Sequence, residues 1–386
     1  MNSNKRQRNS NLELLRIIAM VFIVSHHFAV HGFEDFNFVI ANSNNYLIYF
    51  LGLFGKIGVD IFVLISAYFM VTSKFTLKKL LVLVGGIYFY ALAALSAVVL
   101  FIPAIHLTPG LILRAIFPLS HGYWFMSCYI VLMILSPFLN RFINSLSKNT
   151  FLKLILFMVV IWSLYPTFTG ASLMYGDSFG YGFMAGFILL YFIGAFIRLH
   201  LDISKFNFKK LIVLLIASIV LLYLGSVILT QLGILFNIES LTDGKRTVKV
   251  AYEFFTRENK LFILATSVII FLIFLKRKEF SNKYINYIAG SALGVYLIHD
   301  NTLVRPYLWD HLIVVSSYYN SPNLWILAII SIVSVYIVCT GIDIVRRETV
   351  EKLWIKFVDT KLIDIANRIY IKGLNSCTKM FYSLLR

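Results

Sequence analysis

Two residues near the N-terminus, Arg16 and His27, have the types and the spacing that a buried reaction site requires. They are eleven positions apart, which on an α-helix is about 1100° of rotation, within ~20° of three full turns, and ~16 Å of rise. Both side chains therefore lie on one face of the predicted helix. A neutral imidazole can accept a proton from a hydroxyl, and a guanidinium can bind an anion. The pair predicts an acid–base site with an anion-binding entrance.

A second polar group, the run His-Asp-Asn at 299–301, ends a later apolar segment. We count along each predicted span from its cytoplasmic end, at ~1.5 Å of rise per residue. His299 then lies ~21 Å and His27 ~22 Å from the cytoplasmic surface. The two histidines are thus expected at the same depth. A carboxylate beside them, Asp300, can fix the tautomer of an imidazole and stabilise its cation. We take His27, Arg16, His299 and Asp300 as the candidate catalytic residues.

Each of these residues also has a purely structural interpretation. Arg16 can extend to lipid phosphates or pair with Asp60, which a later segment places at a similar depth, and His27 can be a core histidine with satisfied hydrogen bonds. One such residue alone favours that interpretation, whereas two on one helical face favour function. Trp124, at the start of an apolar run, is typical of an interfacial aromatic belt. We nevertheless include Asp60, Trp124 and Asn301 among the candidate substrate contacts.

The elements that hold these residues are expected to be transmembrane helices. The chain is 59% hydrophobic and 14% charged, with a mean hydropathy of +0.82, whereas a soluble domain has about 25% charged residues. Apolar runs of the ~20 residues that a span needs recur from end to end. We predict an all-α integral membrane protein with about ten transmembrane helices. The expected spans lie near 12–32, 46–71, 80–103, 122–143, 151–170, 177–198, 209–231, 258–275, 285–304 and 322–345.

The distribution of basic residues predicts the orientation. Of the 35 Lys and Arg, 26 lie in alternate loops and the C-terminal tail, against seven in the other loops, so the positive-inside rule places both termini in the cytoplasm. The net charge of +17 follows from this topology and does not indicate a nucleic-acid partner. We predict a transmembrane domain at 1–346 and a cytoplasmic tail at 347–386 that lies as an amphipathic helix on the inner leaflet.

The residues alone leave the class of activity open. A basic inner surface suits an anionic, phosphate-bearing ligand, and buried charges serve enzymes and transporters alike. A transporter or flippase of an anionic lipid-linked sugar is therefore the alternative, although the internal repeats common in transporters are not evident. The three cysteines are too widely spaced to indicate a disulfide framework or a metal site.

Several segments resemble the membrane acyltransferase-3 family. Arg16-x10-His27, in the context NLELLRIIAMVFIVSHHF, resembles the first-helix signature of that family. GKIGVDIFVLISAYFM (55–70) resembles its second-helix segment, with Ala67 where a Gly commonly follows the Ser. Similarity to the branch that modifies bacterial surface polysaccharides extends to YWFMSCYIVLMILSPFLN (123–140), YFIGAFIR (191–198) and GVYLIHDN (294–301). The likeness covers roughly residues 10–346.

The resemblance implies transfer of an acyl group, usually acetyl from acetyl-CoA, to a hydroxyl of a sugar. By motif match, His27 is expected to be the catalytic base and Arg16 part of the donor pathway. We add Lys74, Lys78 and Lys79 as donor phosphate contacts on electrostatic grounds. With the resemblance, the enzyme is preferred to the transporter.

The same resemblance implies the surroundings of the reaction. The protein is expected in the bacterial cytoplasmic membrane, among membrane lipids, with a surface glycan or a lipid-linked oligosaccharide as acceptor and no nucleic acid. We expect no permanently bound cofactor and no metal, because acetyl-CoA enters as a donor substrate. Direct transfer, a covalent acetyl-imidazole intermediate and a homo-oligomer remain open.

Overall fold

The computed structural model describes residues 9–33, 43–102, 108–169, 182–236, 254–257, 259–363 and 365. The described residues form helices and no strands. The first half contains α1 (Ser10–His31), α2 (Asn44–Gly52), α3 (Phe54–Met70), α4 (Leu77–Phe101), α5 (Pro109–Ile116), α6 (Pro118–His121), α7 (Trp124–Ser145), α8 (Lys148–Val159), α9 (Tyr165–Thr169) and α10 (Phe183–His200). The second half contains α11 (Phe208–Leu235), α13 (Leu261–Lys276), α14 (Lys283–Ala289), α15 (Ala292–His299), α16 (Val304–Pro306), α17 (Leu324–Glu348) and α18 (Val350–Phe357).

Within the described residues, nine helical segments are long and apolar enough to cross a membrane. Large apolar side chains on the outer helices, such as Phe138, Val213 and Ile337, are 71%, 65% and 61% exposed, as expected for surfaces that face lipid. The prediction of an all-α integral membrane protein is therefore confirmed. The spans are Ser10–His31, Asn44–Met70, Leu77–Phe101, Trp124–Ser145, Lys148–Thr169, Phe183–His200, Phe208–Leu232, Phe254–Lys276 and Leu324–Glu348.

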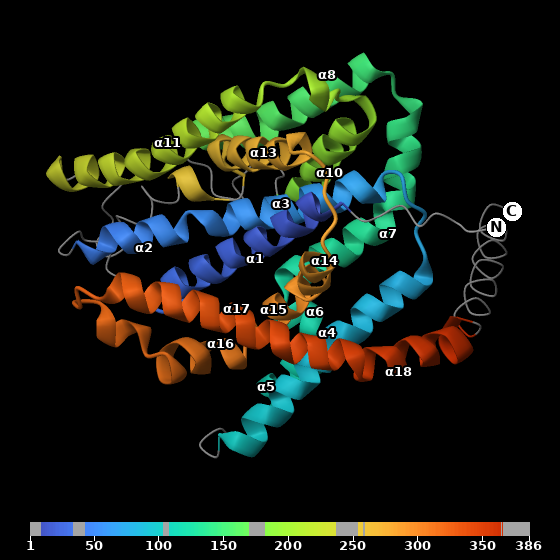
Figure 1. Ribbon diagram of the computed structural model, residues 1–386, viewed down its shortest axis with the longest axis vertical. Helices are drawn as coiled ribbons and strands as arrows, with labels where there is room; N and C mark the ends of the chain where they lie inside the picture. The colour runs from blue at the N-terminus through green and yellow to red at the C-terminus, as the bar shows by residue number, and fades with distance from the viewer. Residues whose placement is uncertain are drawn as a thin grey trace, which may run out of the picture.

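Helix α1 is the centre of the bundle. It packs against α2, α3, α13, α14, α15 and α17, and Figure 1 shows it between the α2–α3 rod and α17. The approach to α3 depends on Gly58, where an added Cβ would lie 2.5 Å from the backbone oxygen of Ala19. Small residues allow such close backbone contact between membrane helices. The helix with Arg16 and His27 is thus fixed on several sides.

The ninth predicted span, 285–304, is not a continuous helix. It consists of α14 and α15, separated at Gly290 and Ser291, and α15 ends at His299. The break has a physical reason, because the guanidinium of Arg347 occupies the space beside Gly290, 2.7 Å from where a Cβ would lie, and donates to Ser291 Oγ at 3.0 Å. The two short helices still follow α1, since Ser10 Oγ donates to Asn286 Oδ1 at 2.7 Å. The segment is an interrupted helix beside α1.

The described part of the C-terminal tail packs onto the bundle. Helix α18 lies against α4, where Trp354 Nε1 donates to the backbone oxygen of Leu81 at 3.0 Å. Gly85 leaves room for the indole, because an added Cβ would lie 2.2 Å from Trp354 Nε1. Leu353 and Phe357 remain 70% and 47% exposed. The tail is therefore anchored to α4 through one face, and contact of its other face with the inner leaflet stays a prediction.

Candidate active site

The His27 and His299 side chains meet between α1 and α15. His27 Nδ1 lies 2.9 Å from His299 Nε2, and His299 Nδ1 lies 2.6 Å from the backbone oxygen of Val295. Their contact agrees with the equal depths counted from the sequence. Because a carbonyl only accepts hydrogen bonds, His299 Nδ1 carries the proton of the neutral ring. His299 Nε2 is then the acceptor and His27 Nδ1 the donor.

This chain of hydrogen bonds determines the tautomer of His27. With the proton on Nδ1, the lone pair of the neutral ring is on Nε2, which makes no hydrogen bond to any described residue. A proton taken up at Nε2 would leave Nδ1–H donating to His299, so the imidazolium retains its partner. The arrangement suits a general base. The sequence predicted that a carboxylate would fix the tautomer, but here His299 Nε2 fixes it by accepting the hydrogen bond from His27 Nδ1.

Asp300 connects His27 with two further groups, His31 at the C-terminal end of α1 and Arg305. Its Oδ1 lies 3.7 Å from His27 Nδ1, 3.8 Å from His31 Nε2 and 3.2 Å from Arg305 Nη1. The Asp300 side chain is only 6% exposed, and charges buried in this way are expected to have partners. Asp300 can therefore stabilise a cation on His27, while Arg305 holds the carboxylate in place.

A small cavity of about 40 Å³ lies beside the His27 ring. Its wall includes Trp124, Tyr296 and Asp300, together with apolar side chains of α1, α3, α7 and α15. Trp124 is therefore part of the cavity wall and is not explained by an interfacial belt alone. Lys56 Nζ lies 5.2 Å from the centre of the indole ring, a distance typical of a cation–π contact.

Arg16 lines a different, larger cavity of about 600 Å³ at the other end of α1. Its guanidinium pairs with Glu13. Arg198 lies in the same wall and donates to Tyr68 Oη at 2.9 Å. Met20, one helical turn from Arg16, lines the His27 cavity. One face of α1 thus contributes Arg16 to the 600 Å³ cavity and His27 to the 40 Å³ cavity.

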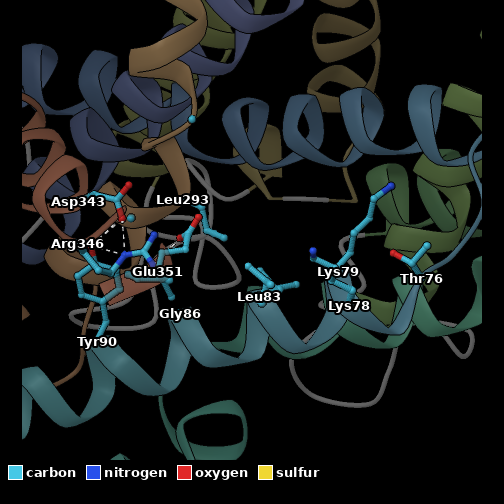
Figure 2. A pocket seen from close by; sticks show the side chains of 14 residues that line it. Thr76, Lys78, Lys79, Leu83, Gly86, Tyr90, Leu293, Asp343, Arg346 and Glu351 are labelled. Carbon is cyan, nitrogen blue, oxygen red and sulfur yellow. Dashed lines mark hydrogen bonds and ion pairs between the residues drawn. The ribbon is translucent and has the colours of Figure 1, made fainter. Parts of the chain in front are cut away.

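A third cavity, of about 460 Å³, lies between α4, α15 and α17. Figure 2 shows Lys78 and Lys79 toward one end and the Asp343–Arg346 pair toward the other. Arg346 Nε donates to Asp343 Oδ1 at 2.9 Å, and Lys78 Nζ pairs with an Asp359 oxygen at 2.6 Å. The cavity therefore joins a basic mouth to a buried ion pair.

Three of the sequence-predicted contacts, Asp60, Lys74 and Asn301, line none of the three cavities described above. The expected Asp60–Arg16 pair does not form, because Arg16 pairs with Glu13 on its own helix while Asp60 Oδ2 accepts from Ser267 Oγ at 3.2 Å. Lys74 is exposed.

The third is Asn301, whose side-chain amide is engaged at both ends. Its Nδ2 donates to Tyr123 Oη at 2.6 Å, and its Oδ1 accepts from the backbone N–H of Leu303 at 2.9 Å. Tyr123 Oη in turn donates to the backbone oxygen of Leu297 at 2.6 Å. These bonds hold the turn that follows α15, and with it His299 and Asp300.

Sequence reasoning missed His31, Arg305 and Tyr296. The spacing of His31, four residues after His27, was a usable signal, because positions i and i+4 share a helical face. Arg305 was counted only as an outer-loop charge, and no spacing rule connects it with α1. Tyr296 is one of 22 tyrosines, and only the fold places it in the wall of the His27 cavity.

His27, His31 and Asp300 have ligand atoms within 4.8 Å of one another, a spacing that could hold a metal ion. The Arg305 guanidinium already lies 3.2 Å from the same Asp300 oxygen. A second cation there would be repelled by Arg305. The donor set therefore fits a hydrogen-bonded acid–base group better than a metal centre.

Comparison with known proteins identifies the family. A family model described as an acyltransferase domain matches residues 9–343, nearly the whole chain. No curated protein and no solved structure gives a significant match. The matched region includes α1 and the α14–α15 segment, and therefore both histidines of the site. The chain belongs to the acyltransferase-3 family of membrane proteins and is a membrane acyltransferase.

Proposed function

We propose that this protein transfers an acetyl group from acetyl-CoA to a hydroxyl of a cell-surface or lipid-linked polysaccharide at the bacterial cytoplasmic membrane. The observation that carries the proposal is the hydrogen-bond chain from Val295 through His299 to His27, which leaves His27 Nε2 as a free base. A base of this kind is what a hydroxyl nucleophile requires.

The size of the His27 cavity favours a short acyl group. At ~10–15 Å³ for each water-sized position, a cavity of about 40 Å³ has room for about three non-hydrogen atoms. An acetyl group has three non-hydrogen atoms, two carbons and one oxygen. A long acyl chain would need a continuous apolar tunnel, whereas the cavity beside His27, which Met20, Ile23 and Phe125 line, is small.

The 460 Å³ cavity is the better candidate for the donor. Lys78 and Lys79 can bind phosphates at its mouth. Its inner wall includes Leu293, which also lines the His27 cavity. Acetyl-CoA bound through its phosphates at Lys78 and Lys79 would therefore extend its thioester toward His27. Arg16, in its separate cavity, would attract the anionic donor from the cytoplasmic side under the predicted orientation.

The chemistry then follows from the tautomer. His27 Nε2 takes the proton of the acceptor hydroxyl as its oxygen forms a bond to the thioester carbonyl carbon. The tetrahedral intermediate collapses, the carbon–sulfur bond breaks, and the CoA thiolate takes the proton back from His27. Asp300 and His299 stabilise the transient imidazolium. The products are an O-acetyl ester and CoA.

The proposal is tested by analysing the surface polysaccharide of the host with and without the gene. Loss of ester-linked acetyl on deletion, and its return on complementation, is expected. An unchanged ester content in the deletion strain would contradict the proposed acceptor class. Hydrolysis in mild base before the analysis separates O-linked from N-linked acetyl, because only the ester is cleaved.

A further inference from the structure

Tyr296 has a buried hydroxyl that the fold leaves without a hydrogen bond. The residue lies on α15, is 5% exposed and lines the His27 cavity. Its Oη has no hydrogen-bond partner among the described residues, although a buried hydroxyl without one is expected to cost about 1–3 kcal/mol. Asp300 approaches this hydroxyl and interacts with it, but the contact falls short of the geometry of a hydrogen bond.

The ring of Tyr296 is nevertheless held firmly. Its centre lies 5.8 Å from the ring of Tyr123, 5.8 Å from that of Phe125 and 6.5 Å from that of His299. These contacts fix the direction of the hydroxyl without using it. A rigid donor that makes no hydrogen bond within the described part of the protein is what electrostatic preorganisation requires. The missing partner is then a group that enters with the substrate.

Acyl transfer creates such a partner. When the acceptor oxygen attacks the thioester, negative charge develops on the carbonyl oxygen, and a donor that meets it in a dry cavity lowers the barrier. Among the residues that line this cavity, Tyr296 is the one with a buried, unpartnered donor. His27 and Asp300, in the same wall, have the roles of base and counter-charge.

We propose that Tyr296 is a catalytic residue whose hydroxyl donates a hydrogen bond to the acyl carbonyl oxygen as it becomes an oxyanion. The inference rests on the proposed function, because it assumes that the acyl group occupies the His27 cavity. The tyrosine keeps its proton throughout. When the carbon–sulfur bond breaks, the electron pair on the oxyanion re-forms the carbonyl.

The test is the Tyr296→Phe substitution, which removes the hydroxyl and keeps the ring contacts. Initial rates of transfer from radiolabelled acetyl-CoA to endogenous glycan are measured in isolated membranes and normalised to the amount of protein. Loss of one oxyanion donor lowers kcat by about 10²–10³-fold. The KM for acetyl-CoA should change little, because the contact forms in the transition state.

Tyr336→Phe is the matched control. Tyr336 on α17 is also buried with an unpartnered hydroxyl, but it does not line the His27 cavity. Its substitution should leave kcat within about twofold, since no reacting atom meets it. If Tyr296→Phe reduces the rate no more than Tyr336→Phe does, the proposal is overturned. If the Tyr296→Phe protein does not accumulate, a fluorinated tyrosine is placed at position 296 instead, because it alters the acidity of the donor. A transfer rate equal to that of the wild-type protein would then overturn the proposal.

Two further comparisons separate the alternatives. In an Asp300→Asn background, Tyr296→Phe should still lower the rate, although by a different factor, because Asp300 acts on the Tyr296 hydroxyl and neighbouring groups are not additive. Disappearance of the effect would mean that Tyr296 acts only through Asp300. Normal transfer by Tyr296→Phe with none by His27→Ala would overturn this inference and leave the proposed function standing. No transfer by the wild-type protein would overturn both.

Discussion

The His299–His27 hydrogen bond gives a quantitative prediction. Replacing His299 with Leu removes the acceptor for His27 Nδ1–H, which lies 2.9 Å away in the native protein. The neutral His27 ring is then free to place its proton on either nitrogen. A molecule with the proton on Nε2 has no base facing the acceptor, and the imidazolium formed during reaction has lost a partner.

The magnitude follows from the strength of the lost bond. A hydrogen bond to a charged group contributes about 1.5–3 kcal/mol, and each 1.36 kcal/mol changes a rate about tenfold. The expected loss in kcat is therefore about 10- to 150-fold. It should be smaller than the loss in His27→Ala, because the base itself remains and Asp300 Oδ1 still lies 3.7 Å from His27 Nδ1.

The assay is the initial rate of transfer from radiolabelled acetyl-CoA to glycan in isolated membranes, normalised to protein content. His299→Gln is the control, since its amide oxygen can accept from His27 Nδ1–H and should limit the loss to less than tenfold. Equal rates for His299→Leu and the wild-type protein would refute the assignment of the tautomer. Equal losses in the Leu and Gln variants would show that the ring, and not its acceptor nitrogen, is needed.

Three further predictions concern the 460 Å³ cavity and the residues that support it. Lys78→Ala should raise the KM for acetyl-CoA severalfold with kcat unchanged, because it removes a phosphate contact that is equal in the ground and transition states; a change confined to kcat would contradict this. Asp359→Asn should lower that KM, since Asp359 now pairs with Lys78 at 2.6 Å, and titration of the transfer rate with acetyl-CoA shows whether it does. Gly294→Ala should destabilise the protein by about 1–3 kcal/mol, because the added Cβ would lie 2.2 Å from Asp343 Cγ; thermal unfolding in detergent measures the loss, and an unchanged Tm would argue against this packing.

The positions of the helices were predictable because the membrane imposes a simple rule on the sequence. A span must be apolar over ~20 residues, and nine of the ten predicted spans correspond to candidate spans in the described residues. The break at Gly290 and Ser291 was not predictable from hydropathy, which ignores the guanidinium of Arg347 that packs against this turn.

Part of the site was predictable for a similar reason. Helical periodicity put Arg16 and His27 on one face, and depth counting put His299 level with His27, because both quantities depend only on the geometry of a straight helix. The partners of Asp60 and Arg305 were beyond that reasoning. They depend on how helices rotate against one another, and a single sequence with mostly apolar spans records little of that rotation.

The central claim is that His27 is the base of an acetyl transfer to surface glycan, and its most direct test is the ester-linked acetyl content of that glycan in cells with His27→Ala as the sole copy of the protein. Membrane abundance of the variant, measured by immunoblot, must equal that of the wild-type protein. We predict an acetyl content as low as in the deletion strain. A content equal to that of the wild-type strain would contradict the account.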